Sequence, residues 1–278
     1  MAMIGKRETL QIVRETRFGL FLAAGELGEV LLPRKEVPVS WAVGNFLNVF
    51  LYHDSEDRPV ATLLTPKVMP GHFAKLRCVA VTGVGAFLDW GLAKDLLVPF
   101  REQKVRMELK KFYVVYVQID EHTDRIVATT RLSRHLDQTP VSYQIGQLVD
   151  LIIFGKTALG YKAIINGAHS GLLFADGVYQ PLQLGESVQG YISALREDGK
   201  VDLTLHPPGR ARVENLESRI LAELEARGGF WAIGDHSSAE QIHDELGVSK
   251  RTFKQTLGAM LKKRSVSQTA KGIRLLNE

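Results

Sequence analysis

One short frame of residues recurs three times along the 278-residue chain and constrains its fold more than any other feature. Each copy begins with a glycine and an apolar run and closes on a second apolar run, over residues 19–33, 85–99 and 160–174. A basic residue then stands four positions before a threonine in every copy: Arg58 and Thr62, Arg125 and Thr129, Lys200 and Thr204. The glycine lies 43, 44 and 44 positions before that threonine, so the pattern predicts three copies of one structural unit.

Each copy contains five short β-runs bounded by Gly, Asp or Pro, with little helical periodicity. In the first copy we expect strands at 9–13, 19–23, 29–33, 46–52 and 60–64. In the second copy we expect them at 73–81, 86–90, 96–98, 112–119 and 125–130. In the third copy we expect them at 148–154, 160–165, 171–173, 187–195 and 200–205. Five short strands suit a small closed barrel of the OB type, because closure removes exposed sheet edges.

The last quarter of the chain changes to a helical period, with Leu216, Ile220 and Leu224 on one face. Ser237 or Ser238 can cap a second helix and Ser249 a third, before a hairpin at 266–276. This order of elements is that of a winged helix. The predicted fold class is mainly β with a C-terminal α+β domain: three tandem five-stranded OB-fold barrels followed by a winged helix. The expected domains are 1–66, 67–139, 140–206 and 212–278.

Composition and charge exclude several classes of protein. The single cysteine, Cys78, excludes an internal disulfide and a thiolate metal cluster. The first residues do not form a secretory signal and no eighteen apolar residues run together, so we expect a cytoplasmic protein without membrane contact. The formal net charge of +4 is unevenly distributed. Residues 67–135 hold 12 basic and 7 acidic residues, whereas residues 136–206 hold 4 and 7.

No motif of an active site occurs in the sequence. The eight histidines have no paired metal-ligand spacing, and there is no Walker loop, nucleophile elbow or repeated carboxylate cluster. The pair Gly83 and Gly85 lacks the third glycine of a dinucleotide loop. We therefore expect no catalytic residues, no metal and no cofactor.

Three sequence motifs resemble those of a known nucleic-acid-binding domain. The run from Phe18 to Leu22, the run from Gly85 to Leu88, and the segment 120–126 before Thr129 resemble the RNA-binding OB-fold domain named after ribosomal protein S-one. Three such barrels followed by a winged helix resemble the bacterial conserved virulence factor B family over nearly the whole chain. The resemblance implies RNA binding, a role in controlling the expression of other genes, and no catalysis.

A single strand is gripped by aromatic faces on which bases stack and by cations that follow the phosphates. The residues that match these roles are Phe18, Phe21, Arg58, Phe87, Arg125, Lys110 and Lys111. Phe18 and Phe21 are three positions apart and share a face only if the strand is kinked or bulged at the glycine between them. The alternative is that these phenylalanines fill the barrel interiors.

The three copies differ in the residues that they offer to RNA. The middle copy combines an aromatic ring with the largest positive charge, so we expect it to supply most of the RNA affinity. In the third copy Leu159 and Lys162 replace both rings and the charge is negative, which favours a spacer or a docking surface.

The winged helix carries a second basic cluster, which lacks Asp and Glu from 247 to 274. Its candidate contacts with nucleic acid are Lys250, Arg251, Lys254, Lys262, Lys263, Arg264 and Lys271. The alternative is a solvated helix face, as many basic helices are. Contacts to phosphates do not distinguish duplex DNA from structured RNA.

The leading hypothesis is a regulator that binds single-stranded RNA through its barrels, with help from the winged helix. A DNA-binding transcriptional regulator and an accessory factor of a ribonuclease are the alternatives. The target sequences, the placement of the domains and the oligomeric state stay open.

Overall fold

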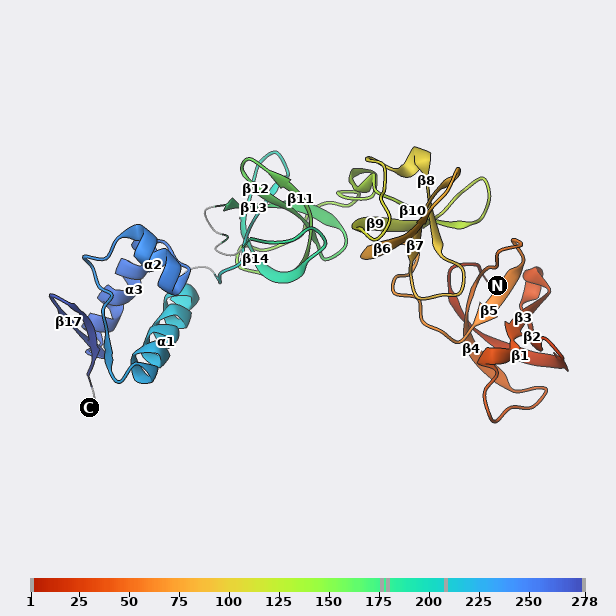
Figure 1. Cartoon of the computed structure of the whole chain (residues 1–278), viewed down its shortest axis with the longest axis horizontal. Coiled ribbons are helices and arrows are strands. Elements are labelled where there is room, and N and C mark those ends of the chain that lie inside the picture. Colours follow the sequence, from red (N-terminus) through yellow and green to blue (C-terminus); the bar gives the residue numbers. More distant parts are fainter. Residues whose placement is uncertain (1–2, 176–177, 179–180, 208–209, 277–278) are drawn as a thin grey trace. The chain divides into compact units, whose positions relative to one another are not determined.

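The computed structural model describes residues 3–175, 178, 181–207 and 210–276, in two compact units. The first unit, Met1–Gln138, contains two barrels, and the second, Thr139–Glu278, contains a third barrel and a helical domain. Figure 1 shows each barrel as a ring of strands and the helical domain as three helices beside a small sheet. The fold class that the sequence predicts is therefore confirmed.

All three barrels are closed and have the same strand order, with the third and fifth strands parallel. The first consists of β1 (Arg7–Thr16), β2 (Gly19–Ala23), β3 (Glu29–Pro33), β4 (Phe46–His53) and β5 (Pro59–Thr62). The second consists of β6 (Phe73–Val81), β7 (Gly85–Asp89), β8 (Leu96–Pro99), β9 (Phe112–Ile119) and β10 (Ile126–Thr129). The third consists of β11 (Leu148–Thr157), β12 (Gly160–Ile165), β13 (His169–Phe174), β14 (Ser187–Leu195) and β15 (Val201–Thr204).

The alternation of side chains along the strands decides what each barrel buries. Leu20 and Leu22 of β2 are fully buried, whereas Phe21 between them is half-buried on the outer surface. Successive residues of a strand point to opposite faces, so the core takes every second side chain. The strand therefore presents the aromatic ring outward because its aliphatic neighbours fill the interior.

A β-bulge lies at the same place in the first strand of every barrel. The register with the second strand shifts at residues 12–14, 78–80 and 153–155. The bulge lets the strand bend and continue around the barrel. This corrects the strands predicted to end at residues 13 and 154, because β1 and β11 continue past the bulge to Thr16 and Thr157.

A threonine and a glycine build the turn that follows this strand. In the first barrel Thr16 Oγ1 donates a hydrogen bond to the Gly19 carbonyl at 3.2 Å and accepts one from the Phe18 amide at 3.3 Å. Thr82 and Thr157 donate the same bond in the other barrels, at 3.5 and 3.1 Å. The turn thus holds the residue before the glycine in a fixed position.

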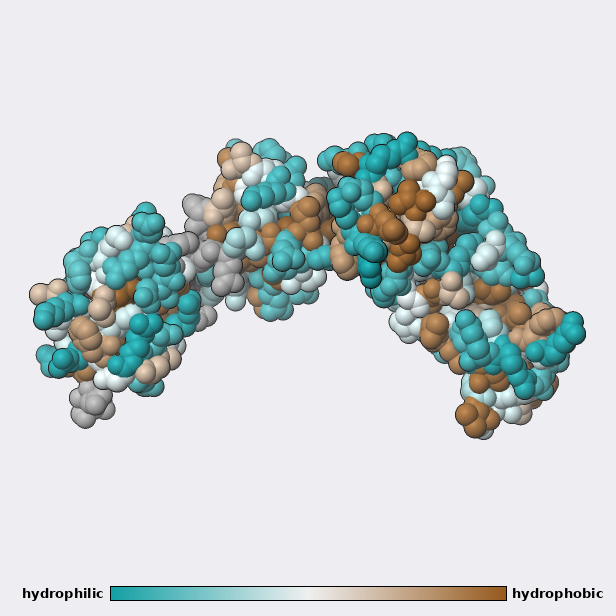
Figure 2. All heavy atoms as spheres, in the orientation of Figure 1, coloured by the Kyte–Doolittle hydropathy of each residue, from teal (hydrophilic) through white to brown (hydrophobic). Residues whose placement is uncertain are grey.

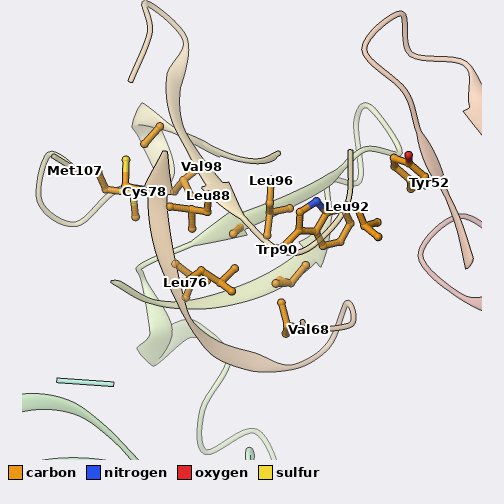
Figure 3. Packing of buried hydrophobic residues seen from close by; sticks show 14 of the residues in the cluster. Tyr52, Val68, Leu76, Cys78, Leu88, Trp90, Leu92, Leu96, Val98 and Met107 are labelled. Atoms are coloured by element: carbon orange, nitrogen blue, oxygen red, sulfur yellow. The ribbon is translucent and has the colours of Figure 1, made fainter. Parts of the chain in front are cut away.

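The second barrel packs on the outer face of β4 in the first barrel. Trp90 lies edge-on to Phe50 and to Tyr52, with ring centroids 6.0 and 6.5 Å apart. These rings belong to one hydrophobic cluster with Leu92 and Leu88 of the second barrel, which Figure 3 shows from close by. The two barrels of the first unit therefore share part of a core.

The C-terminal domain is a winged helix. Its elements are α1 (Arg210–Ala226), β16 (Phe230–Trp231), α2 (Ala239–Leu246), α3 (Lys250–Lys262), β17 (Val266–Thr269) and β18 (Gly272–Leu275). Ser238 Oγ accepts from the Gln241 amide at 3.0 Å and Ser249 Oγ from the Thr252 amide at 3.3 Å, so both serines cap helices as predicted. Phe253, Leu257 and Met260 of α3 are buried, which leaves the opposite face of that helix to solvent.

Replacing Gly85 with alanine should destabilise the second barrel, because a Cβ there would overlap the carbonyl oxygen of Val98. We expect a loss of about 2–4 kcal/mol, read from hydrogen exchange at the amides of β7 and β8. Gly83, in the same turn, is the matched control, since a Cβ there meets nothing within 4 Å. Gly83→Ala should change stability by less than about 0.5 kcal/mol, and equal losses in both variants would contradict this role of Gly85.

Candidate nucleic-acid interface

A row of side chains crosses the outer face of each barrel from the second strand to the third and the fifth. In the first barrel the row is Phe21, Leu31 and Val60, which pair in register across β2, β3 and β5. In the second barrel the corresponding row is Phe87, Leu97 and Val127. In the third barrel it is Lys162, Leu172 and Asp202. Val60 and Val127 are buried, Val60 within the cluster that joins the two barrels, so the first two barrels present a ring beside one half-buried leucine. The third barrel presents two charges beside Leu172.

The turn before each glycine exposes one apolar side chain beside this row. Phe18, Val84 and Leu159 occupy the position in the three barrels and are 59%, 62% and 64% exposed. Phe18 and Phe21 therefore do not share one regular strand, because Phe18 lies in the turn and Gly19, with φ of +145°, begins β2. Figure 2 shows hydrophobic side chains gathered on the surface of the second barrel.

Arginines lie over the two rings of the first barrel. The Arg14 guanidinium is 3.8 Å from the ring centroid of Phe21, and that of Arg17 is 4.6 Å from the ring of Phe18. Cation–π contacts of this kind place a positive charge where a base or phosphate would approach. In the second barrel the residue paired with Phe87 is Ala80, so no cation covers that ring from the neighbouring strand.

The basic residues before the last strands are all engaged with carboxylates. Arg58 pairs with Asp54 at 2.7 Å, and Lys200 pairs with Asp198 at 2.5 Å. The hydrogen bond from Lys200 holds the pKa of Asp198 below its ordinary value, so this carboxylate is ionised at neutral pH. Arg125 pairs at 2.6 Å with Asp57 of the first barrel. A nucleic acid has to compete for each of these cations.

Lys110 and Lys111 lie away from the ring of the second barrel. Lys111 pairs with Glu108 at 2.7 Å, and the backbone of both lysines bonds to that of Cys78 in β6. Neither lysine lines the pocket that contains Phe87 and Arg125. The sequence grouped Phe87, Arg125, Lys110 and Lys111 in the middle barrel. The structure brings Phe87 and Arg125 together, and the two lysines lie elsewhere.

The basic cluster of the winged helix is partly neutralised by acids that lie elsewhere in the sequence. Lys254 pairs with Asp235 at 2.8 Å and Lys263 pairs with Glu217 at 2.8 Å. The hydrogen bond from Lys254 lowers the pKa of Asp235, which favours the ionised carboxylate. The segment 247–274 contains no acids, but acids from outside it neutralise two of its lysines. The free positive charge of the segment is therefore smaller than the sequence indicates. In the described part of the chain, no ion pair engages Lys250, Arg251, Lys262, Arg264 or Lys271.

The wing of this domain repeats the turn of the barrels. Thr269 Oγ1 donates to the Gly272 carbonyl at 2.9 Å and accepts from the Lys271 amide at 3.3 Å. Lys271 therefore occupies the position that Phe18, Val84 and Leu159 hold in the barrels, and it is exposed. The turn presents a cation here in place of an apolar side chain.

Sequence reasoning missed several residues of this interface. The aliphatic members of the rows, Leu31 and Leu97, are the half-buried residues between two buried neighbours, and that alternation was a usable signal. Asp57 was missed because nothing local links it to Arg125, 68 positions away. Among the described residues, no group of three or more His, Cys, Asp or Glu is placed to hold a metal ion. In the same residues, no helix has the length and apolar character needed to span a membrane.

Two family models match the ends of the chain. Residues 4–64 match the S1 domain, and residues 218–275 match the CvfB-like winged helix domain. YitL of Bacillus subtilis is 27% identical over 95% of this chain and 91% of its own length. Conserved virulence factor B of Staphylococcus epidermidis is 23% identical over 95% of this chain and 92% of its own. The S1 domain and the winged helix are both nucleic-acid-binding types of domain, so these matches support nucleic-acid binding as the function.

A solved structure aligns with 98% of the chain. It is a multidomain protein with nucleic acid binding domains from Streptococcus pneumoniae, 22% identical over 98% of both chains, with a TM-score of 0.46. The resemblance to the conserved virulence factor B family rests on the two family models and on the two bacterial proteins, and not on this structure. The resemblance is confirmed: with an S1 domain, two further barrels and a CvfB-like winged helix, the chain is similar to the conserved virulence factor B proteins over 95% of its length.

Proposed function

We propose that this protein is a cytoplasmic, non-catalytic regulator of gene expression that binds single-stranded RNA on the outer faces of its first two barrels. The observation that carries the proposal is an outward ring paired with a half-buried leucine on the neighbouring strand, Phe21 with Leu31 and Phe87 with Leu97. The regulatory role is what the resemblance to the conserved virulence factor B family implies.

Unpaired bases suit this surface better than a duplex does. A base in a single strand exposes its faces, and stacking on an aromatic ring contributes about 1–3 kcal/mol per base with little sequence preference. Phe18 projects from a turn and Phe21 lies beside it on the strand, so two rings reach the surface of the first barrel, each with an arginine over it. A duplex hides its base faces and would meet only the cations of these barrels.

The three barrels divide the work unequally in this proposal. The first has two rings and the arginines over them, and the second has Phe87 next to Arg125. The third has Lys162 and Asp202 where the others have apolar side chains, and Asp202 pairs with Arg196 at 3.0 Å. We assign the third barrel the role of a spacer between the stacking barrels and the winged helix.

The winged helix supplies a second, electrostatic contact. Arg251 and Lys262 lie on one flank of α3, and Lys271 is exposed at the wing. Cations that are not engaged with carboxylates release counterions when they meet phosphates. This contact adds affinity without reading sequence.

A titration of labelled single-stranded RNA and of duplex DNA of equal length tests the proposal on the full-length protein. We expect the RNA to bind more tightly, and with about four phosphates neutralised its affinity should fall roughly fiftyfold between 50 and 200 mM salt. Tighter binding of the duplex would favour a DNA-binding transcriptional regulator instead. Metal-dependent cleavage of the RNA would contradict a non-catalytic role.

Phe18→Ala should raise the Kd for single-stranded RNA about tenfold, because one base loses its stacking partner. Stability should stay unchanged, since the ring is 59% exposed and outside the core. Leu159→Ala removes the side chain at the same turn position of the third barrel and is the matched control. Equal losses of affinity in both variants would contradict the assignment of the first barrel as a stacking barrel.

Arg251→Ala should weaken RNA binding about three- to tenfold and reduce the salt slope by about 0.7, the value for one phosphate of a single strand. Lys254→Ala, one turn along α3, should have a smaller effect because Asp235 already engages that lysine at 2.8 Å. Filter binding at several salt concentrations measures both. A salt slope that Arg251→Ala leaves unchanged would remove the winged helix from the interface.

A further inference from the structure

A pocket of about 490 Å³ lies between the first and the second barrel, within the first compact unit. Tyr52, His53 and Asp57 line it from β4 and the β4–β5 turn of the first barrel. Phe87 and Arg125 line it from the second barrel. Small-ligand pockets span about 300–1,000 Å³, so the space suits one nucleotide. The stacking ring of the second barrel thus faces a wall that the first barrel supplies.

Asp57 holds two cations in this pocket. Its carboxylate accepts from Arg125 Nη2 at 2.6 Å and lies 3.3 Å from Lys94 Nζ. Lys94 Nζ also donates to the carbonyl oxygen of Asp54 at 2.6 Å. An oxygen anion facing a guanidinium and an ammonium is the arrangement in which a phosphate binds. The Asp57 carboxylate therefore occupies the place that a phosphate would take.

Breaking the ion pair between Arg125 and Asp57 costs little free energy. The side chains of Arg125 and Asp57 are 48% and 44% exposed. Ion pairs at such exposure contribute only about 0–1 kcal/mol, so a phosphate that contacts both cations can replace the carboxylate.

A residue that lines the pocket has an unused hydrogen-bonding atom. His53 Nδ1 is buried, and none of the described residues forms a hydrogen bond with it. A buried polar atom left without a partner costs about 1–3 kcal/mol, which a ligand with a polar edge would recover. A nucleotide combines the three features that the pocket matches: a flat ring for Phe87, a polar base edge for His53, and a phosphate for Arg125 and Lys94.

We infer that this pocket binds one nucleotide of the bound single strand, with its base on Phe87 and its phosphate in place of the Asp57 carboxylate. The inference rests on the proposed function and deepens it. The nucleotide site of the second barrel is built in part by the first barrel, and Asp57 restrains it by competing with the phosphate. Binding to the second barrel thus depends on the docking of the two barrels.

Asp57→Asn tests the competition directly. Asparagine keeps the size of the side chain and tolerates the φ of +60° at this position. We expect this variant of the full-length protein to bind a ten-nucleotide oligouridylate about three- to tenfold more tightly than the unmodified protein. Asp198→Asn is the matched control, because it removes the carboxylate that pairs with the corresponding basic residue, Lys200, within one hairpin of the third barrel. The control should bind within twofold of the unmodified protein.

Photocrosslinking of a bromouridine-substituted oligonucleotide locates the bound strand independently. Trypsin releases peptide 78–94, which contains Phe87, and peptide 18–34, which contains Phe18 and Phe21. We expect RNA adducts on both peptides. If the protein binds RNA but peptide 78–94 carries no adduct, or if Asp57→Asn binds no tighter than Asp198→Asn, the pocket inference is overturned while the proposed function stands. A full-length protein that binds no single-stranded RNA overturns both.

Discussion

Closure of each barrel depends on a glycine that lets two strands approach where a side chain would not fit. At Gly19 and Gly160, with φ of +145° and +146°, a Cβ would overlap the carbonyl oxygen of the third strand. The backbone therefore turns sharply from the first strand into the second, and the alternation of inner and outer residues starts from that point. Leu20 and Leu22 enter the core, and Phe21 is left on the surface. The outward position of the Phe21 ring is thus a consequence of how the barrel closes.

The same closure gives three surfaces of different chemistry, because only the outer residues are free to vary. The inner residues of the second strand stay apolar in all three barrels, as in Leu20, Ala86 and Tyr161. The outer position is Phe21, Phe87 or Lys162, and the row that begins there ends on the fifth strand in a valine in two barrels and in Asp202 in the third. A ring beside a leucine can hold a base, whereas the third barrel has Lys162 in place of the ring and an aspartate that Arg196 engages. The fold alone would not distinguish the barrels, and the outer rows do.

Much of the fold follows from local patterns in the sequence, and the site follows only in part. The observed bounds of β2, β3, β6, β9, β12 and β14 equal the predicted ones, since period-two alternation and flanking glycines mark such strands. The capping serines of α2 and α3 were also readable, because caps act over three residues. The ion pairs Arg125–Asp57 and Lys254–Asp235 were not, because they join elements whose approach depends on tertiary packing. These pairs engage two of the cations that the sequence offered to nucleic acid.

The central claim is that the outer faces of the first two barrels contact single-stranded RNA. Hydrogen–deuterium exchange of the full-length protein, with and without a saturating single-stranded oligonucleotide, tests it most directly. The account predicts slower exchange over residues 18–33 and 85–99, with the corresponding segment 160–174 unchanged. Slower exchange at 160–174 with none in the first two barrels would contradict it.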